Sequence, residues 1–425
     1  MRLNFVLVAL FFPSTLWVLA EQSELSRKSE LHQMFLLRDA LSKHSRASDF
    51  YAGEVACAFN DTATCEEKFK NVLAVEPTPP EAKQIHDILA NVAMREGRYG
   101  RCLHEIDALL AVDPSNSDAK TTRPFIEVLS HFPGQAVRKS GNGKTSVHMD
   151  DGKLPLLING EKASYFFDTG ANLSIISESD ALRFAMEIQE AKGGVTGDVH
   201  GNTVSYRIAV AKSLVLGGIE LSNVAFLVSS DEQQPFVDME PRQRGLIGLP
   251  VLLALGSITW TREGVFEADR SPLPVNLLAA NMFFEGLNLI TQARFDRRLL
   301  PFVLDTGAST SELWPKFAGV ARDLIRKSGT REPNKVMGMG GGEKSEITSI
   351  PKVMLELGGM SVALQPAHIL ETQQRTESKW FYGNLGIDLL RQAQRVTINF
   401  KTMTLKLDNI EKGCIEAHLP RHIFG

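Results

Sequence analysis

The sequence predicts a mainly β protein in which two similar β units follow one another and an α-helical region precedes them. Three observations predict this class. The first third of the chain is rich in helix-forming residues and lacks strand-like alternation. After about residue 133, short apolar runs alternate with Gly, Asn and Asp turns, which is typical of all-β structure. Four landmarks of this β part recur in the same order about 140 residues later, which indicates an internal repeat.

Length and composition agree with this architecture and exclude several classes of protein. The chain has 425 residues, and a domain of roughly 100–200 residues is usual, so we expect more than one domain. Hydrophobic residues make up 43% and charged residues 23%, which is typical of folded chains. The formal net charge of −4 does not support a nucleic-acid-binding or polybasic membrane surface. We therefore expect no nucleic-acid partner.

The first element, residues 1–20, has the features of a secretory signal peptide. A basic start at Arg2 is followed by an apolar run over residues 3–12, and Val18 and Ala20 form a small-residue cleavage pattern. The alternative is an uncleaved membrane anchor, although the apolar run is short. No later stretch is long and apolar enough to span a membrane. We expect a secreted or periplasmic protein without a membrane span after cleavage.

Export changes the interpretation of the four cysteines. Cys57 and Cys65 are close in sequence and could close a small disulfide loop in an oxidising compartment. Cys102 and Cys414 could pair with each other or remain buried free thiols, and the sequence leaves both alternatives open.

The second element, residues 21–135, is predicted to be helical. Leu-Ala-Val-Glu-Pro at 73–77 is echoed by Leu-Ala-Val-Asp-Pro at 110–114, with two apolar helical stripes and a Gly97 turn between them. This pattern resembles a tetratricopeptide-type unit, and an ordinary helical hairpin is the alternative. Such a region could pack on the β units or bind a protein partner.

The third and fourth elements are the two β units, residues 136–275 and 276–425. In each, a predicted hairpin runs into the same four residues, Asp-Thr-Gly-Ala, at 168–171 and at 305–308. Farther along, Gly-Leu-Ile-Gly at 245–248 is echoed by Gly-Asn-Leu-Gly at 383–386. Two such loops brought face to face would place Asp168 and Asp305 close together. Because two adjacent carboxylates cannot both ionise easily, the pair would hold one proton and could serve as acid and base.

With these motifs, the β part, roughly residues 140–410, resembles the retropepsin-like aspartic peptidases. The tandem order resembles the single-chain, two-lobed arrangement of pepsin-like enzymes. The resemblance implies that Asp168 and Asp305 are the catalytic pair. It also implies a supporting role for the next residues of each loop, which brace the loops or shape their turns: Thr169, Gly170, Thr306 and Gly307.

Two further features follow from the resemblance. The stretches 246–248 and 384–386 would form the support behind each loop, and Asn384 is polar where the family pattern has an apolar residue. Glycine-flanked hairpins would form a flap over the site in each unit, and their candidate residues are Gly197, His200, Gly201, Gly338 and Gly340. A polypeptide substrate would lie extended between flaps and carboxylates.

The sequence thus predicts an exported aspartic endopeptidase. The alternative is a catalytically inactive, two-lobed peptide-binding protein with a helical docking region. The His residues show no metal-ligand spacing, and the mechanism requires no cofactor, so neither a metal nor a cofactor is expected. Because one chain supplies both carboxylates, a monomer suffices.

Overall fold

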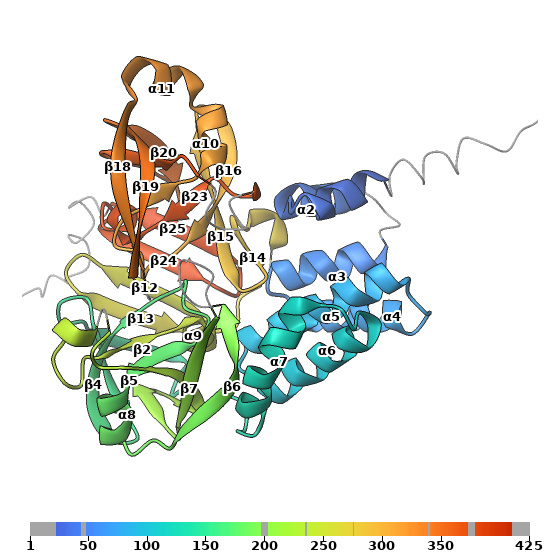
Figure 1. The fold of residues 1–425 in the computed structure, drawn as a ribbon, viewed down its shortest axis with the longest axis vertical. Helices are drawn as coiled ribbons and strands as arrows, with labels where there is room; N and C mark the ends of the chain where they lie inside the picture. The colour runs from blue at the N-terminus through green and yellow to red at the C-terminus, as the bar shows by residue number, and fades with distance from the viewer. Residues whose placement is uncertain are drawn as a thin grey trace, which may run out of the picture.

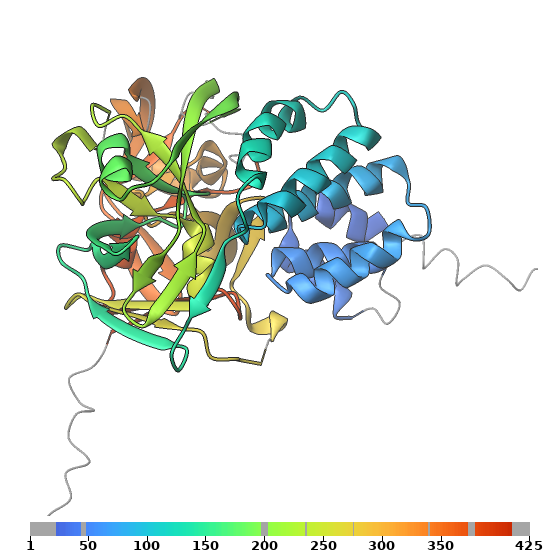
Figure 2. The ribbon, with the colours of Figure 1, turned by 90° about the horizontal axis from the view of Figure 1, so that it is seen from below.

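The computed structural model describes residues 23–43, 48–196, 203–233, 236–274, 276–338, 341–372 and 379–409. A helical region lies on one side of a β body in both views (Figures 1 and 2). The predicted mainly β class with a helical front is therefore confirmed. The predicted signal peptide lies outside the described residues. Within the described ranges, no helix combines the length and apolar character needed to cross a membrane.

Six helices with assigned bounds precede the first strand of the described chain: α2 Met34–Leu41, α3 Asp49–Ala58, α4 Thr62–Leu73, α5 Pro79–Arg95, α6 Tyr99–Val112 and α7 Ser117–Ser130. Helix α5 begins at a capping box in which Thr78 and Glu81 bond each other's backbone N–H groups. It ends before Gly97, whose φ of 68° allows the reversal into α6. The predicted helix–turn–helix is confirmed, whereas its tetratricopeptide-like nature stays a prediction.

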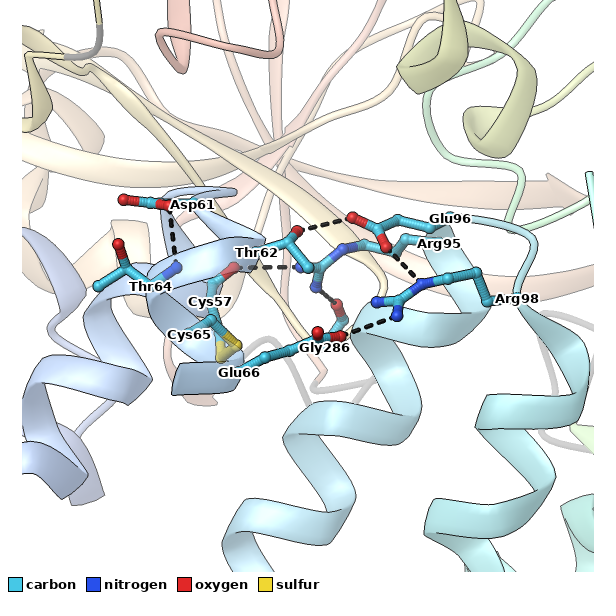
Figure 3. The surroundings of a disulfide bond; sticks show 10 residues. All are labelled: Cys57, Asp61, Thr62, Thr64, Cys65, Glu66, Arg95, Glu96, Arg98 and Gly286. Carbon is cyan, nitrogen blue, oxygen red and sulfur yellow. Dashed lines mark hydrogen bonds and ion pairs between the residues drawn. A yellow bond between two sulfur atoms is a disulfide. The ribbon is translucent and has the colours of Figure 1, made fainter. Parts of the chain in front are cut away.

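The helical region contains one disulfide, and Arg95 ties that region to the β body (Figure 3). Cys57 and Cys65 form the predicted bond. The buried Arg95 guanidinium donates to the Cys57 carbonyl at 3.1 Å and to the Gly286 carbonyl of the β body at 2.7 Å. Cys102 is a free, buried thiol whose pKa burial raises to about 12, and Cys414 lies outside the described residues.

Most strands belong to two ten-stranded sheets. The first has the order β1-β9-β8-β3-β4-β11-β5-β10-β7-β6. Its strands are β1 Ala136–Lys139, β3 Leu154–Ile158, β4 Glu161–Phe167, β5 Ser174–Ser177, β6 Ile188–Thr196, β7 Thr203–Ala211, β8 Leu214–Leu216, β9 Ile219–Ser222, β10 Val224–Ser229 and β11 Gly245–Ile247.

The second ten-stranded sheet has the order β18-β19-β22-β17-β23-β16-β15-β20-β21, with β14 paired to β15. Its strands are β14 Met282–Glu285, β15 Asn288–Phe295, β16 Arg298–Leu304, β17 Glu312–Leu313, β18 Thr330–Gly338, β19 Gly341–Ile350, β20 Val353–Leu357, β21 Met360–Leu364, β22 Ala367–Leu370 and β23 Gly383–Leu385. Read backwards, this order matches the first sheet strand for strand from β9 to β6. In both, the strand before an Asp-Thr-Gly loop is parallel to a short central strand, β11 or β23.

A five-stranded sheet, β2-β13-β12-β24-β25, joins the two β units. Its strands are β2 Lys144–His148, β12 Ser257–Thr261, β13 Val265–Asp269, β24 Arg395–Asn399 and β25 Thr404–Asp408. The central β12–β24 pair places Trp260 opposite Val396. The sheet therefore draws strands from both sides of the boundary at 275/276. That boundary stays a prediction. The five-stranded sheet is a part of the structure that both units share.

Short helices fill the remaining connections of the β body: α8 Glu178–Arg183, α9 Leu249–Leu255, α10 Pro315–Val320, α11 Arg322–Ser328 and α12 Ile387–Leu390, with 3-10 turns η1 Phe236–Asp238 and η2 Leu277–Ala279. Helices α9 and α12 directly follow the short central strands β11 and β23, at corresponding places in the two halves.

The helical region shares a hydrophobic core with the first sheet. Helix α7 packs along β6 (Figure 1). Phe125 of α7 and Met94 of α5 are buried in one cluster with Leu173 and Ile208 of the β body. Burial of four large apolar side chains at about 1.5–3 kcal/mol each is enough to fix the position of the helices. The helical region is therefore anchored beside the first Asp-Thr-Gly loop.

Candidate active site

The loops that follow β4 and β16 hold Asp168 and Asp305 at the same place in the two halves. The Asp168 N–H donates to the Ile247 carbonyl at 2.8 Å, and the Asp305 N–H donates to the Leu385 carbonyl at 3.0 Å. Each aspartate therefore sits where a strand ends against a parallel neighbour. This is the support behind each loop that the resemblance implied.

The threonines of the two loops bond each other's loop reciprocally. The Thr169 N–H donates to the Thr306 hydroxyl, and the Thr306 N–H donates to the Thr169 hydroxyl, each at 3.0 Å. The Thr169 hydroxyl also donates to the Leu304 carbonyl at 2.8 Å, and that of Thr306 to the Phe167 carbonyl at 3.2 Å. Because both threonines are buried, these bonds are shielded from water and hold the loops together.

The glycines of the two loops bring the carboxylates together. A Cβ built on Gly170 would lie 2.7 Å from the Asp305 carboxyl carbon, and a Cβ on Gly307 would approach the Asp168 carboxylate more closely still. Any side chain at either position would therefore push the opposite carboxylate away. The structure thus brings together all six residues predicted for the two loops.

Burial raises the pKa of the Asp168 carboxyl, and the neighbouring charge of Asp305 raises it further. The backbone N–H groups of Gly170 and Gly307 oppose this shift. The Asp168 carboxyl is half-buried, so water and substrate can reach it. Two coupled carboxyl groups that hold one proton can accept a proton from water and donate one to a carbonyl oxygen.

Asn384 adds a contact that sequence reasoning missed. Its Nδ2 donates to Oδ2 of Asp305 at 2.9 Å. The Asp305 Oδ1 atom also accepts from the N–H groups of Gly307 and Ala308, at 3.0 and 3.1 Å. The corresponding residue of the first half is Leu246, which has no side-chain donor. The sequence signal was visible as a polar residue in an apolar pattern, but its meaning depends on the fold.

Two serines that were not singled out hold the support strands in place. The Ser174 hydroxyl accepts from the Gly248 N–H at 3.0 Å, and the Ser311 hydroxyl accepts from the Gly386 N–H at 2.8 Å. Each serine stands six residues after its aspartate. That shared offset was available in the sequence as one more landmark of the repeat.

The structure describes the strands of both candidate flaps but not the residues 197–202 and 339–340 between them. Strands β6 and β7 form one hairpin, and β18 and β19 form the other, with Gly338 paired to Gly341. Of the predicted flap residues, Gly338 ends β18. Gly197, His200, Gly201 and Gly340 lie outside the described residues.

Two cavities meet at Asp168. One, of about 550 Å³, lies between the Asp168 loop and helices α5, α6 and α7. The other, of about 730 Å³, lies toward the five-stranded sheet and is lined by Phe166, Leu246 and Trp260. Both are large enough for several substrate side chains. Among the described residues, no cluster of His, Cys, Asp and Glu is arranged to bind a metal ion.

Part of the chain is similar to known aspartic proteases. Residues 154–251, which include Asp168, match the model of a family described as aspartyl protease. No curated protein matches the chain. A solved retropepsin-like aspartic protease from Rickettsia conorii is 16% identical over 31% of this chain and 93% of that one, with a TM-score of 0.22. The retroviral protease-like domain of Ddi1 from Leishmania major is 24% identical over 29% of this chain and 90% of that one, with a TM-score of 0.23.

Proposed function

We propose that this chain is an exported aspartic endopeptidase that hydrolyses peptide bonds with a water molecule activated between Asp168 and Asp305. The observation that carries the proposal is the packing of the two loops face to face, which puts each carboxyl group against the glycine of the opposite loop. The match of residues 154–251 to an aspartyl-protease family supports it. Each support strand passes behind its aspartate, which gives the carboxyl groups a rigid base.

The donors around the pair favour one assignment of the two roles. Both aspartates accept from backbone N–H groups, and Asp305 accepts in addition from the Asn384 amide, which stabilises a negative charge on Asp305. The raised pKa of Asp168 keeps its proton in place. Asp305 is therefore the base and Asp168 the acid at the start of the reaction.

The reaction balances without a cofactor. Asp305 takes one proton from water, the water oxygen bonds to the substrate carbonyl carbon, and Asp168 gives its proton to the carbonyl oxygen. A neutral diol results. Asp305 then gives the proton it took to the amide nitrogen, the C–N bond breaks, and Asp168 regains a proton from a diol hydroxyl. The products are one carboxylic acid and one amine, and the pair is restored.

Several further features belong to the same proposal. The substrate is a polypeptide that lies extended beneath the two hairpins, bonded through its backbone. The matching strand orders of the two large sheets support an internal duplication. The protein acts as a monomer in a secreted or periplasmic location, and the disulfide between Cys57 and Cys65 suits an oxidising compartment.

Proteolysis of an unstructured protein over a range of acidic to neutral pH tests this function. We expect cleavage by the wild type and none by Asp168→Asn or Asp305→Asn, because either change removes half of a shared-proton pair. A hydroxyl-bearing mimic of the diol should inhibit. Retention of most activity by either variant would overturn the mechanism. Peptide binding without cleavage at any pH would instead identify an inactive peptide-binding protein.

A further inference from the structure

The helical region forms one wall of a cavity that ends at the Asp168 carboxyl group. Helices α5, α6 and α7 all contribute to this wall. The opposite wall is the loop that follows Asp168, from Gly170 to Leu173. Because a substrate bound at the carboxyl pair must extend past this loop, its side chains on that side would enter the space between loop and helices. The helices are anchored there by a shared buried core, so the wall is a fixed part of the cleft.

The cavity combines an apolar interior with acidic side chains. Its interior is lined by buried groups from both walls, among them Ala90, Met94, Leu109, Ala119, Phe125 and Leu173. Asp87 of α5 and Asp118 of α7 lie on its helical wall, and both are on exposed faces. Among the described residues, the charged groups that line the cavity are these two aspartates and Asp168, all acidic.

The charge on the helical wall is poorly compensated. Although Asp87 lies on an exposed face, desolvation by the protein packed around its carboxyl group raises the pKa of that group, and the negative charges of Glu285 and Asp118 raise it further. Lys83 opposes the shift, but its ammonium group bonds Asp113 at 2.6 Å. A cation placed between Asp87 and Asp118 would relieve this repulsion.

The cavity on the other side of Asp168 differs in charge. Arg262 and Arg391 line it, together with Asp151 and a largely aromatic and aliphatic surface. A cationic side chain would meet two guanidinium groups there, offset in part by the Asp151 carboxylate. The two cavities therefore differ in the charge of the side chains that line them.

We propose that the cavity between the helical region and the Asp168 loop is a substrate subsite that takes a lysine or arginine side chain. This inference rests on the proposed function and adds a substrate class to it. The aliphatic stem lies along the apolar interior, and the charged end reaches Asp87 and Asp118. The helical region is thereby a specificity-determining part of the enzyme. The two aspartates bind substrate and take no part in bond cleavage.

Paired peptide substrates test the proposal on the full chain. In each pair, one position beside the scissile bond carries either lysine or norleucine, which has a similar stem but no charge. We expect one position at which lysine raises kcat/KM by about two- to fivefold, the effect of roughly one solvent-screened ion pair. The Asp87→Asn, Asp118→Asn double variant should bring this ratio close to one and leave the norleucine peptide unchanged. Added salt should reduce the wild-type ratio.

The matched control is Asp107→Asn on α6, an acidic residue that pairs with Arg123 and does not line the cavity. It should keep the wild-type ratio. The proposal is overturned if no position prefers lysine, or if the double variant keeps the preference. It is also overturned if the double variant slows both peptides equally while its thermal unfolding matches the wild type. If norleucine peptides are cleaved, the proposed function stands whatever the lysine result; if no peptide is cleaved, the proposed function itself fails.

If the double variant does not fold, Thr122→Lys provides a second test. Thr122 is a partly exposed residue of α7 that lines the same cavity. A lysine there should fill the subsite with a cation and abolish the preference for lysine peptides. An unchanged preference in this variant would also contradict the proposal.

Discussion

The two Asp-Thr-Gly loops have nearly the same backbone but different chemical surroundings. Each aspartate N–H bonds the support strand behind it, and each threonine bonds the opposite loop. One difference lies in the support strands, where the first half has Leu246 and the second has Asn384. The amide of Asn384 adds a donor to Asp305, and the apolar Leu246 adds none to Asp168. Two loops with matching backbone hydrogen bonds can therefore hold carboxyl groups that have different side-chain donors.

The largest expected effect on activity comes from substitution of the glycine that follows Asp-Thr in each loop. Gly170→Ala and Gly307→Ala should each reduce kcat/KM by about a hundredfold or more, because displacing a reacting group by about 1 Å has that effect. Gly307→Ala should be the more damaging, since its Cβ would approach the opposite carboxylate more closely. Kinetics on one peptide checks both. Gly319→Ala, where nothing lies within 4 Å of the added Cβ, is the control and should remain active.

The reciprocal threonines should show a clear effect on stability. Thr169→Val and Thr306→Val each leave a buried N–H and a buried carbonyl without a partner, and each should lower the free energy of unfolding by roughly 1–3 kcal/mol. The double variant should lose less than the sum, because the two residues share bonds. Urea unfolding measures all three. Serine at either position keeps the hydroxyl and should restore most of the loss; strictly additive losses would contradict a shared network.

The pH dependence of stability should distinguish the two aspartates. The folded-state pKa of Asp168 is raised, so its stabilising contribution is present at low pH and is lost as pH rises through that pKa. The free energy of unfolding of the wild type should therefore fall between about pH 4 and pH 7 relative to that of Asp168→Asn, which cannot ionise. Denaturant titrations at several pH values test this. A constant difference across that range would exclude a raised pKa.

Removal of the Asn384 contact should change activity the least of these substitutions. It tests most directly whether Asn384 makes the surroundings of Asp305 differ from those of Asp168. Asn384→Leu gives the second half the residue type that Leu246 provides in the first half. The change removes a hydrogen-bond donor that stabilises the ionised form of the carboxyl pair. The acidic limb of the kcat/KM profile should move to higher pH by roughly one to two units, as expected for one hydrogen bond to a charge. Asn399→Leu, a change of the same type in β24, is the control and should leave the limb in place. A lower rate with an unshifted limb would indicate a purely structural role for Asn384.

Local patterns in the sequence predicted the elements that depend on neighbouring residues. The Gly97 turn between two helices and the Cys57–Cys65 disulfide follow from short-range spacing, and both are present. The Asp168 and Asp305 loops could be paired because their surroundings repeat along the chain. Asn384 could be noticed but not interpreted, since its contact with Asp305 joins residues 79 positions apart.

The sequence by itself determined the class of structure, the helical front and the two aspartates, because hydrophobic periodicity and repeated motifs are properties of consecutive residues. Only the tertiary structure decided three other features. The five-stranded sheet joins both β units, helices α5, α6 and α7 line a cavity that reaches Asp168, and Asn384 makes the carboxyl pair unequal. Each depends on segments that are distant in sequence and meet only when apolar surfaces are buried together. Their contacts leave little trace in local composition.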